Sequence, residues 1–212
     1  MFIELIDLLR CTKPHDETWL VAAFNTVSNR FVEEGKLGCP TCSAEYWIRD
    51  GVGDFSGGVS LPACDAERSA TGHSREELAT RAGAYLDATE AGATVVLGGL
   101  WAYAAEELSA MSDVRVLALN APSDVKESER VGLLRVASEI PLATGSVLGV
   151  ALDAWFPEGI AESAARVVRP QGRVVGPAGL AVPAGLTVLA HDDKYWVAEK
   201  PPEVISIRRA SR

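Results

Sequence analysis

Residues 91–120, AGATVVLGGLWAYAAEELSAMSDVRVLALN, decide the fold of this 212-residue chain. They contain an apolar run of strand length, Thr94–Leu97, which leads into a pair of glycines. Apolar residues at helical spacing then extend from about Trp101 to Met111, and a second apolar run, Val114–Leu119, follows. A strand, a helix and a strand joined by short loops predict a unit whose strands belong to one parallel sheet.

The same alternation continues toward the C-terminus. The capping box Ser74–Glu77 predicts a helix before this unit, and a second helix is expected from about Glu158 to Val168. The last two apolar segments, joined by the polar turn His191–Lys194, predict an antiparallel hairpin. The predicted fold class is therefore α/β: a small β-rich unit, then a Rossmann-like sheet with a C-terminal antiparallel hairpin. The further strands expected are Val131–Val136, Val147–Leu152, Arg173–Gly176, Leu186–Ala190 and Tyr195–Glu199.

Two stretches in this region resemble the class I S-adenosylmethionine-dependent methyltransferases. SEIPLATGSVLGVALDAW (residues 138–155) is similar to the segment around their fourth strand, and ESAARVVRPQGRVV (residues 162–175) to the helix, turn and strand that follow. The resemblance covers about residues 75–200. It implies a methyltransferase-type sheet, with S-adenosylmethionine held by a Gly-rich turn after the first strand and by acids after the second and third.

The residues at those cofactor positions depart from the family's pattern. Gly98 and Gly99 supply the turn, but Asn120 stands where the second strand should end in an acid, and Val136 stands near the third. The two glycines also fit a tight strand–helix packing turn. Asp153 ends the fourth strand, where a turn role is favoured over catalysis. The pattern therefore favours a degenerate sheet, which keeps the shape of the fold without the residues that bind the cofactor.

The first fifth of the chain carries two pairs of residues that bind metals. Cys11 and His15 lie in CTKPH, and Cys39 and Cys42 lie in GCPTC, which has the C-x-x-C spacing of a zinc knuckle. Together they predict a closed, four-ligand, structural zinc site. Asp16 could replace His15 as the fourth ligand, and the alternative reading is ordinary thiols beside a surface histidine.

The run LGCPTCSAEYWIRDGVGDF (residues 37–55) resembles the small zinc-ribbon proteins related to tRNA methyltransferase 112, over about residues 1–56. Some members of that family activate methyltransferases by lending a strand and an apolar surface. The resemblance implies that Cys11, His15, Cys39 and Cys42 are the metal ligands. This chain differs in its first pair, which reads Cys-x-x-x-His instead of Cys-x-x-Cys.

Composition limits the partners that can be expected. The net charge of −9 disfavours direct nucleic-acid binding, and three arginines near the C-terminus make a poor nucleic-acid site. No apolar run reaches membrane-spanning length, so a cytoplasmic protein is expected. The expected organisation is a zinc ribbon (1–56), a linker (57–73) in which Cys64 is a spare thiol, a methyltransferase-like domain (74–200) and a basic tail (201–212).

These features predict a non-catalytic zinc-binding protein whose degenerate methyltransferase-like domain serves as an interaction or accessory module for a protein partner. The alternative is a methyltransferase that binds S-adenosylmethionine at a divergent site containing Gly98, Gly99 and Asn120. We further expect the two units to pack on each other through apolar residues around Trp47 and Ile48, with two independent units as the alternative.

Overall fold

The computed structural model of the chain describes residues 1–59, 72–157 and 159–202. Cys64, most of the linker expected at 57–73 and most of the tail expected at 201–212 lie outside these ranges. Among the described residues, no helix is long and apolar enough to span a membrane.

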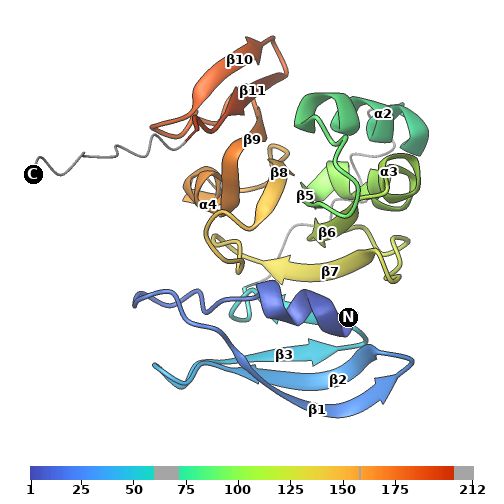
Figure 1. Ribbon diagram of the computed structural model, residues 1–212, viewed down its shortest axis with the longest axis vertical. Helices are drawn as coiled ribbons and strands as arrows, with labels where there is room; N and C mark the ends of the chain where they lie inside the picture. The colour runs from blue at the N-terminus through green and yellow to red at the C-terminus, as the bar shows by residue number, and fades with distance from the viewer. Residues whose placement is uncertain (60–71, 158, 203–212) are drawn as a thin grey trace, which may run out of the picture.

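The described elements build one mixed sheet with helices on both of its faces (Figure 1). The strands are β1 (Val21–Ser28), β2 (Phe31–Gly38), β3 (Glu45–Arg49), β4 (Val52–Phe55), β5 (Thr94–Gly98), β6 (Arg115–Leu119), β7 (Val131–Val136), β8 (Val147–Ala151), β9 (Val168–Pro177), β10 (Thr187–His191) and β11 (Tyr195–Glu199). The helices are α2 (Arg75–Leu86), α3 (Ala105–Ser112) and α4 (Gly159–Val167), with 3₁₀ turns η1 (Ile3–Leu8) and η2 (Gly99–Ala104).

The C-terminal part of the sheet has the strand order β7-β6-β5-β8-β9-β11-β10. Strands β5 to β9 are parallel, and β11 pairs antiparallel with both β9 and β10. This is the Rossmann-like, methyltransferase-type sheet with a closing hairpin that the sequence predicts. The order reverses between β5 and β8, which is the point where open α/β sheets place their ligands.

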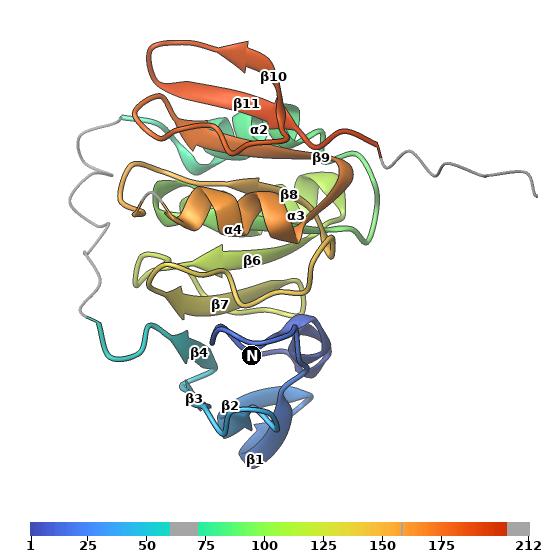
Figure 2. The same ribbon diagram turned by 90° about the vertical axis from the view of Figure 1, so that its left-hand side faces the viewer.

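The N-terminal strands extend the same sheet. Strands β1, β2, β3 and β4 form an antiparallel meander, and β4 then pairs in parallel with β7. Gly53, Asp54 and Phe55 are in register with Leu134, Arg135 and Val136. Seen from the side, the strands stack continuously from β1 at one end to β10 at the other (Figure 2). The two units are therefore joined by backbone pairing.

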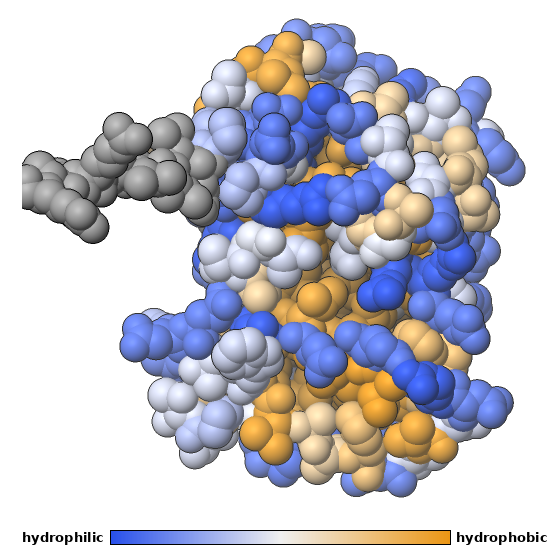
Figure 3. All heavy atoms as spheres, viewed as in Figure 1, coloured by the Kyte–Doolittle hydropathy of each residue, from blue (hydrophilic) through white to orange (hydrophobic). Residues whose placement is uncertain are grey.

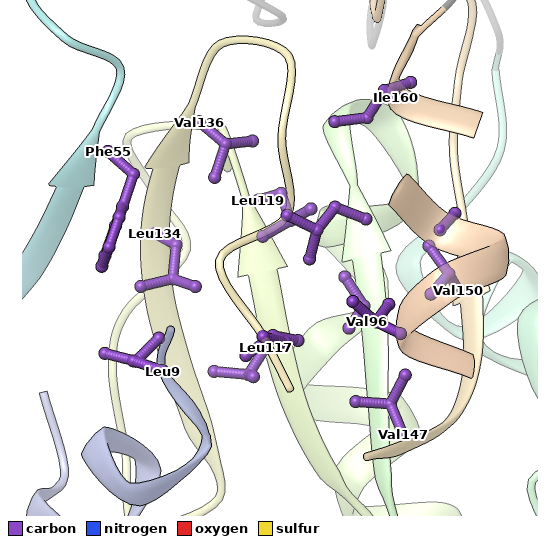
Figure 4. Packing of buried hydrophobic residues seen from close by; sticks show 14 of the residues in the cluster. Leu9, Phe55, Val96, Leu117, Leu119, Leu134, Val136, Val147, Val150 and Ile160 are labelled. Atoms are coloured by element: carbon purple, nitrogen blue, oxygen red, sulfur yellow. The ribbon is translucent and has the colours of Figure 1, made fainter. Parts of the chain in front are cut away.

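One buried core crosses this joint. Leu9 and Phe55 from the N-terminal unit pack in the same cluster as Leu134 of β7 and Ile160 of α4 (Figure 4). A second cluster fills the opposite face, beneath α2 and α3. Period-two alternation along the strands explains the division, because successive side chains point to opposite faces. Val96 belongs to the first cluster, and its neighbours Val95 and Leu97 belong to the second.

Of the two residues around which the units were expected to pack, only Ile48 belongs to the core cluster that crosses the joint. Ile48 is fully buried, but Trp47 is 42% exposed and lies between the cationic groups of Lys36 and Arg49. Tyr46 is buried, so the side chains along β3 alternate between the two faces of the sheet. Trp47 points to the other face of β3 and does not belong to the core cluster that crosses the joint.

Several element boundaries also differ from the expected ones. The helix expected from Trp101 starts as the 3₁₀ turn η2 and becomes α-helical only at Ala105. Strand β9 begins at Val168, because Val168 already pairs with Val147, whereas the strand was expected to begin at Arg173. Strands β1 to β4 all lie in the N-terminal unit, which was expected to be small and β-rich.

Candidate metal centre and cofactor site

The four predicted metal ligands converge at one point. Their ligand atoms all lie within 4.8 Å of one another. The Cys11 and Cys42 sulfurs are 3.7 Å apart, and Nε2 of His15 lies 3.2 Å from the Cys11 sulfur and 3.3 Å from the Cys39 sulfur. A tetrahedral zinc ion, with bonds of about 2.3 Å to sulfur and 2.0 Å to nitrogen, separates two sulfurs by about 3.8 Å and sulfur from nitrogen by about 3.5 Å. The cluster therefore has the dimensions of a tetrahedral metal site.

Local hydrogen bonds orient these side chains. Nδ1 of His15 lies 2.7 Å from the carbonyl oxygen of Asp16, which can only accept, so the proton resides on Nδ1 and Nε2 faces the sulfurs with its lone pair. The Cys39 N–H donates to the carbonyl of Ala44, and the Ser43 N–H donates back to the carbonyl of Cys39. These two bonds close the tight turn that carries Cys39 and Cys42. The carboxylate of Asp16 is absent from the cluster.

The thiols have different electrostatic surroundings. Burial opposes ionisation of Cys39, but backbone N–H groups of Cys42 and Thr41, together with the Cys11 and Cys42 thiols, lower its pKa to about 6. Burial raises the pKa of Cys11, against hydrogen bonds from the Tyr46 hydroxyl and the Lys13 N–H. A thiolate at Cys39 is the form that a metal requires.

A group of polar contacts around Glu17, not predicted from the sequence, holds the metal-binding loop against the α/β sheet. The carboxylate of Glu17 accepts hydrogen bonds from the N–H and the hydroxyl of Thr144, at 2.8 and 2.7 Å. It also lies 3.6 Å from Arg10 and from Arg166. Thr144 belongs to the connection between β7 and β8, so the loop that carries Cys11 and His15 is held against the second unit.

The turn after β5 is occupied by a carboxylate from the same chain. Asp153 is buried, and its Oδ2 accepts a 2.5 Å hydrogen bond from the N–H of Leu100. A Cβ added at Gly99, where φ is +60°, would overlap this carboxylate, and one added at Gly98 would lie 2.7 Å from the Phe156 ring. The two glycines are thus needed for close packing against Asp153 and Phe156. Asp153 therefore lies at the switch point between β5 and β8, in contact with the turn after β5.

The end of β6 is closed in a similar way. Asn120 has a positive φ of 51°, and its amide group donates to the carbonyl of Val136 and accepts from the Val136 N–H, both at 2.9 Å. Its side chain therefore bridges β6 to β7. Asn120 also lines a pocket of about 470 Å³, together with Val52, Lys126 and Arg135, but Gly98 and Gly99 do not contribute to that lining. Gly98 pairs with Leu119, so the two glycines and Asn120 lie at the adjoining ends of β5 and β6.

No protein-family model matches the sequence, and no curated protein sequence is significantly similar to it. Solved structures match the fold at low identity. One is a chain from the complex between the Haloferax volcanii Trm112 methyltransferase activator and a protein described as a methyltransferase, at 17% identity and TM-score 0.47. That match covers 67% of this chain and all of the other.

Two further matches have different described activities. A Methanococcus maripaludis protein described as an S-adenosylmethionine-dependent methyltransferase is 10% identical with TM-score 0.44, covering 61% of this chain and 86% of the other. The [4+2]-cyclase SpnF is 13% identical with TM-score 0.44, covering 54% and 58%. At these identities and TM-scores the matches say nothing about activity, because one fold hosts many functions.

Proposed function

We propose that this chain is a non-catalytic, zinc-binding accessory protein, in which a metal-braced ribbon and a degenerate methyltransferase-like sheet act as one interaction module. One observation carries this proposal: the carboxylate of Asp153 occupies the switch point, bonded to the Leu100 N–H. A methyltransferase needs that position open so that the cofactor can approach the glycine backbone. Here the chain's own side chain takes the space.

The zinc part of the proposal is supported by the donor set. Three cysteines and one histidine suit zinc, and four protein ligands leave no open coordination position. Cys11, His15, Cys39 and Cys42 would hold the ion, and its chemistry would be structural. The metal would stabilise the N-terminal unit by joining the loop that carries Cys11 and His15 to the turn that carries Cys39 and Cys42.

The alternative, a methyltransferase with a divergent site at Gly98, Gly99 and Asn120, requires Asp153 and Asn120 to leave their present partners. The Asn120 side chain donates to the Val136 carbonyl and accepts from the Val136 N–H. The ribose of a cofactor could bind Asn120 only after these two hydrogen bonds break. Asn120 also lacks the negative charge of the acid that the methyltransferase family has at this position. Loss of one hydrogen bond to a charged group costs about 1.5–3 kcal/mol, or roughly tenfold to a hundredfold in affinity.

A thermal-shift experiment with zinc-loaded protein tests the proposal. At 1 mM S-adenosylmethionine, a site with a dissociation constant of about 10 µM would add about 2.7 kcal/mol of stability and shift the melting temperature by several degrees. We expect no shift with S-adenosylmethionine or with S-adenosylhomocysteine. A clear shift with either ligand would overturn the non-catalytic role and promote the alternative.

A further inference from the structure

Tyr46 carries a polar hydroxyl into the core of the N-terminal unit. Figure 3 shows apolar side chains at the surface of the end of the molecule that holds β1 to β3. Within β3, Trp47 is 42% exposed, but its neighbour Tyr46 is only 6% exposed. A buried tyrosine hydroxyl usually has a hydrogen-bond partner. The partners of this hydroxyl therefore indicate the role of the residue.

The Tyr46 hydroxyl contacts the loop that carries the first pair of metal ligands. Its oxygen lies 3.2 Å from the Cys11 sulfur, 3.1 Å from the backbone nitrogen of Thr12 and 3.1 Å from Oγ1 of Thr12. Cys11 and Tyr46 are 35 positions apart in the chain, so these contacts join the metal-binding loop to β3. A metal ligand is thus in contact with a polar group that is not a ligand itself.

The direction of each hydrogen bond follows from what the groups can donate. The Thr12 N–H can only donate, so the Tyr46 oxygen accepts from it. A thiolate, which is the form in which a cysteine binds a metal, can only accept. A tyrosine hydroxyl keeps its single proton at neutral pH. With Cys11 ionised, the Tyr46 proton is therefore donated to the sulfur, and the Thr12 hydroxyl donates to the Tyr46 oxygen.

The Tyr46 ring is held from the joint between the two units. It stacks on Phe55 of β4, with ring centroids 4.5 Å apart and an interplanar angle of 26°. Phe55 is held in turn, because its backbone is in register with Val136 of β7. The hydroxyl that contacts Cys11 is thus positioned by the strands of the sheet. A donor held in this way orients the ligand that it contacts.

We propose that Tyr46 is a positioning residue of the metal centre: its hydroxyl donates to the Cys11 thiolate, orients this ligand and stabilises its negative charge. The inference rests on the proposed zinc site and adds a residue outside the four ligands. Hydrogen bonds from outside the ligand set typically contribute about tenfold to a hundredfold to metal affinity. They also draw electron density away from a ligand sulfur, which changes the spectrum of a coloured metal.

Tyr46→Phe tests the proposal, because it removes the hydroxyl and keeps the ring on Phe55. In competition with a chelator of known affinity, we expect it to bind Zn²⁺ about tenfold or more weakly than the wild type. Loss of the bond from Thr12 would also disturb the loop, so a second readout is the spectrum of the Co²⁺-loaded protein. Without the hydrogen bond the sulfur lone pairs of Cys11 lie higher in energy. The sulfur-to-cobalt charge-transfer band should therefore move to longer wavelength.

Co²⁺ is added in excess, so that a weakened variant is still loaded, and circular dichroism checks that it is folded. Tyr85→Phe is the matched control, because Tyr85 packs against Trp101 and the core cluster on the opposite face of the sheet. It should keep the wild-type affinity and band.

Two sets of outcomes separate this inference from the proposed function on which it rests. A wild type that binds neither Zn²⁺ nor Co²⁺ would overturn the metal site itself. If the wild type binds both metals, an unchanged band in Tyr46→Phe, or an affinity within about twofold of the wild type, would overturn only the role of Tyr46. The same changes in Tyr85→Phe would overturn that role as well.

Discussion

Gly132 on β7 lies where the turn η1 packs onto the sheet, and replacing it by alanine tests that joint. A Cβ at this position would overlap Cδ1 of Leu5 and lie 2.9 Å from Cδ2 of Leu117. Leu5 is 2% exposed and Leu117 is fully buried, so neither side chain can swing into solvent. The added methyl group must displace one of them.

The expected cost follows from overpacking. Forcing an extra methyl group into a filled core costs about 1–3 kcal/mol. Removing a glycine from a strand returns about 0.5–1 kcal/mol of conformational entropy, so we expect Gly132→Ala to lower the free energy of unfolding by about 1–2 kcal/mol. Gly179→Ala is the control, because nothing lies within 4 Å of its added Cβ, and its effect should stay within about 0.5 kcal/mol.

Urea unfolding followed by tryptophan fluorescence, on zinc-loaded protein, measures both variants. Leu5→Val removes the atom that the new methyl group would strike, so Leu5→Val and Gly132→Ala should be coupled by about 0.5 kcal/mol or more in a double-mutant cycle. If Gly132→Ala behaves like Gly179→Ala, or if the two costs simply add, then η1 does not pack on β7 as described.

Three further predictions concern the metal loop and the closed turn. Elemental analysis should find one zinc per chain in the wild type and in Asp16→Asn. Cys39→Ser should contain no zinc, and His15→Ala should retain it weakly. If Asp16→Asn loses zinc and His15→Ala keeps it, Asp16 is the fourth ligand. Glu17→Ala should lower the free energy of unfolding by about 1–2 kcal/mol, because it removes the two bonds to Thr144 from a partly exposed site, whereas Glu129→Gln, at an exposed position, should be neutral in the same urea titration. Asp153→Ala should cost about 2–4 kcal/mol through the lost bonds to Leu100 and Trp155, and a stability equal to the wild type would show that the carboxylate does not hold the turn.

Local spacing was enough to predict each of the two residue pairs in the Cys/His cluster. Cys39 and Cys42 are fixed by one tight turn, and Cys11 and His15 by one loop, so the sequence places each pair before any tertiary contact forms. Strands β5, β6 and β8 were predictable for a similar reason, because each is a nearly continuous apolar run. Such runs can be recognised as strands without knowing which strand lies beside them.

The joint between the units could not be predicted from these patterns. Strand β4 has four residues, and its pairing with β7 depends on backbone groups that every sequence carries. The hydrogen bonds between Glu17 and Thr144 join residues 127 positions apart, and neither residue lies in a distinctive sequence motif. The position of Asp153 just after β8 was predictable from the apolar run that precedes it. Its bond to Leu100 depends on the path of the chain after Gly99, which only the structure reveals.

The central claim is that the methyltransferase-like sheet has no working site for S-adenosylmethionine. Isothermal titration calorimetry of the zinc-loaded wild type with S-adenosylmethionine tests it most directly. We predict no measurable binding, because Asp153 occupies the turn after β5 and Asn120 is bonded to Val136. A one-to-one isotherm with a micromolar or tighter dissociation constant would contradict the account.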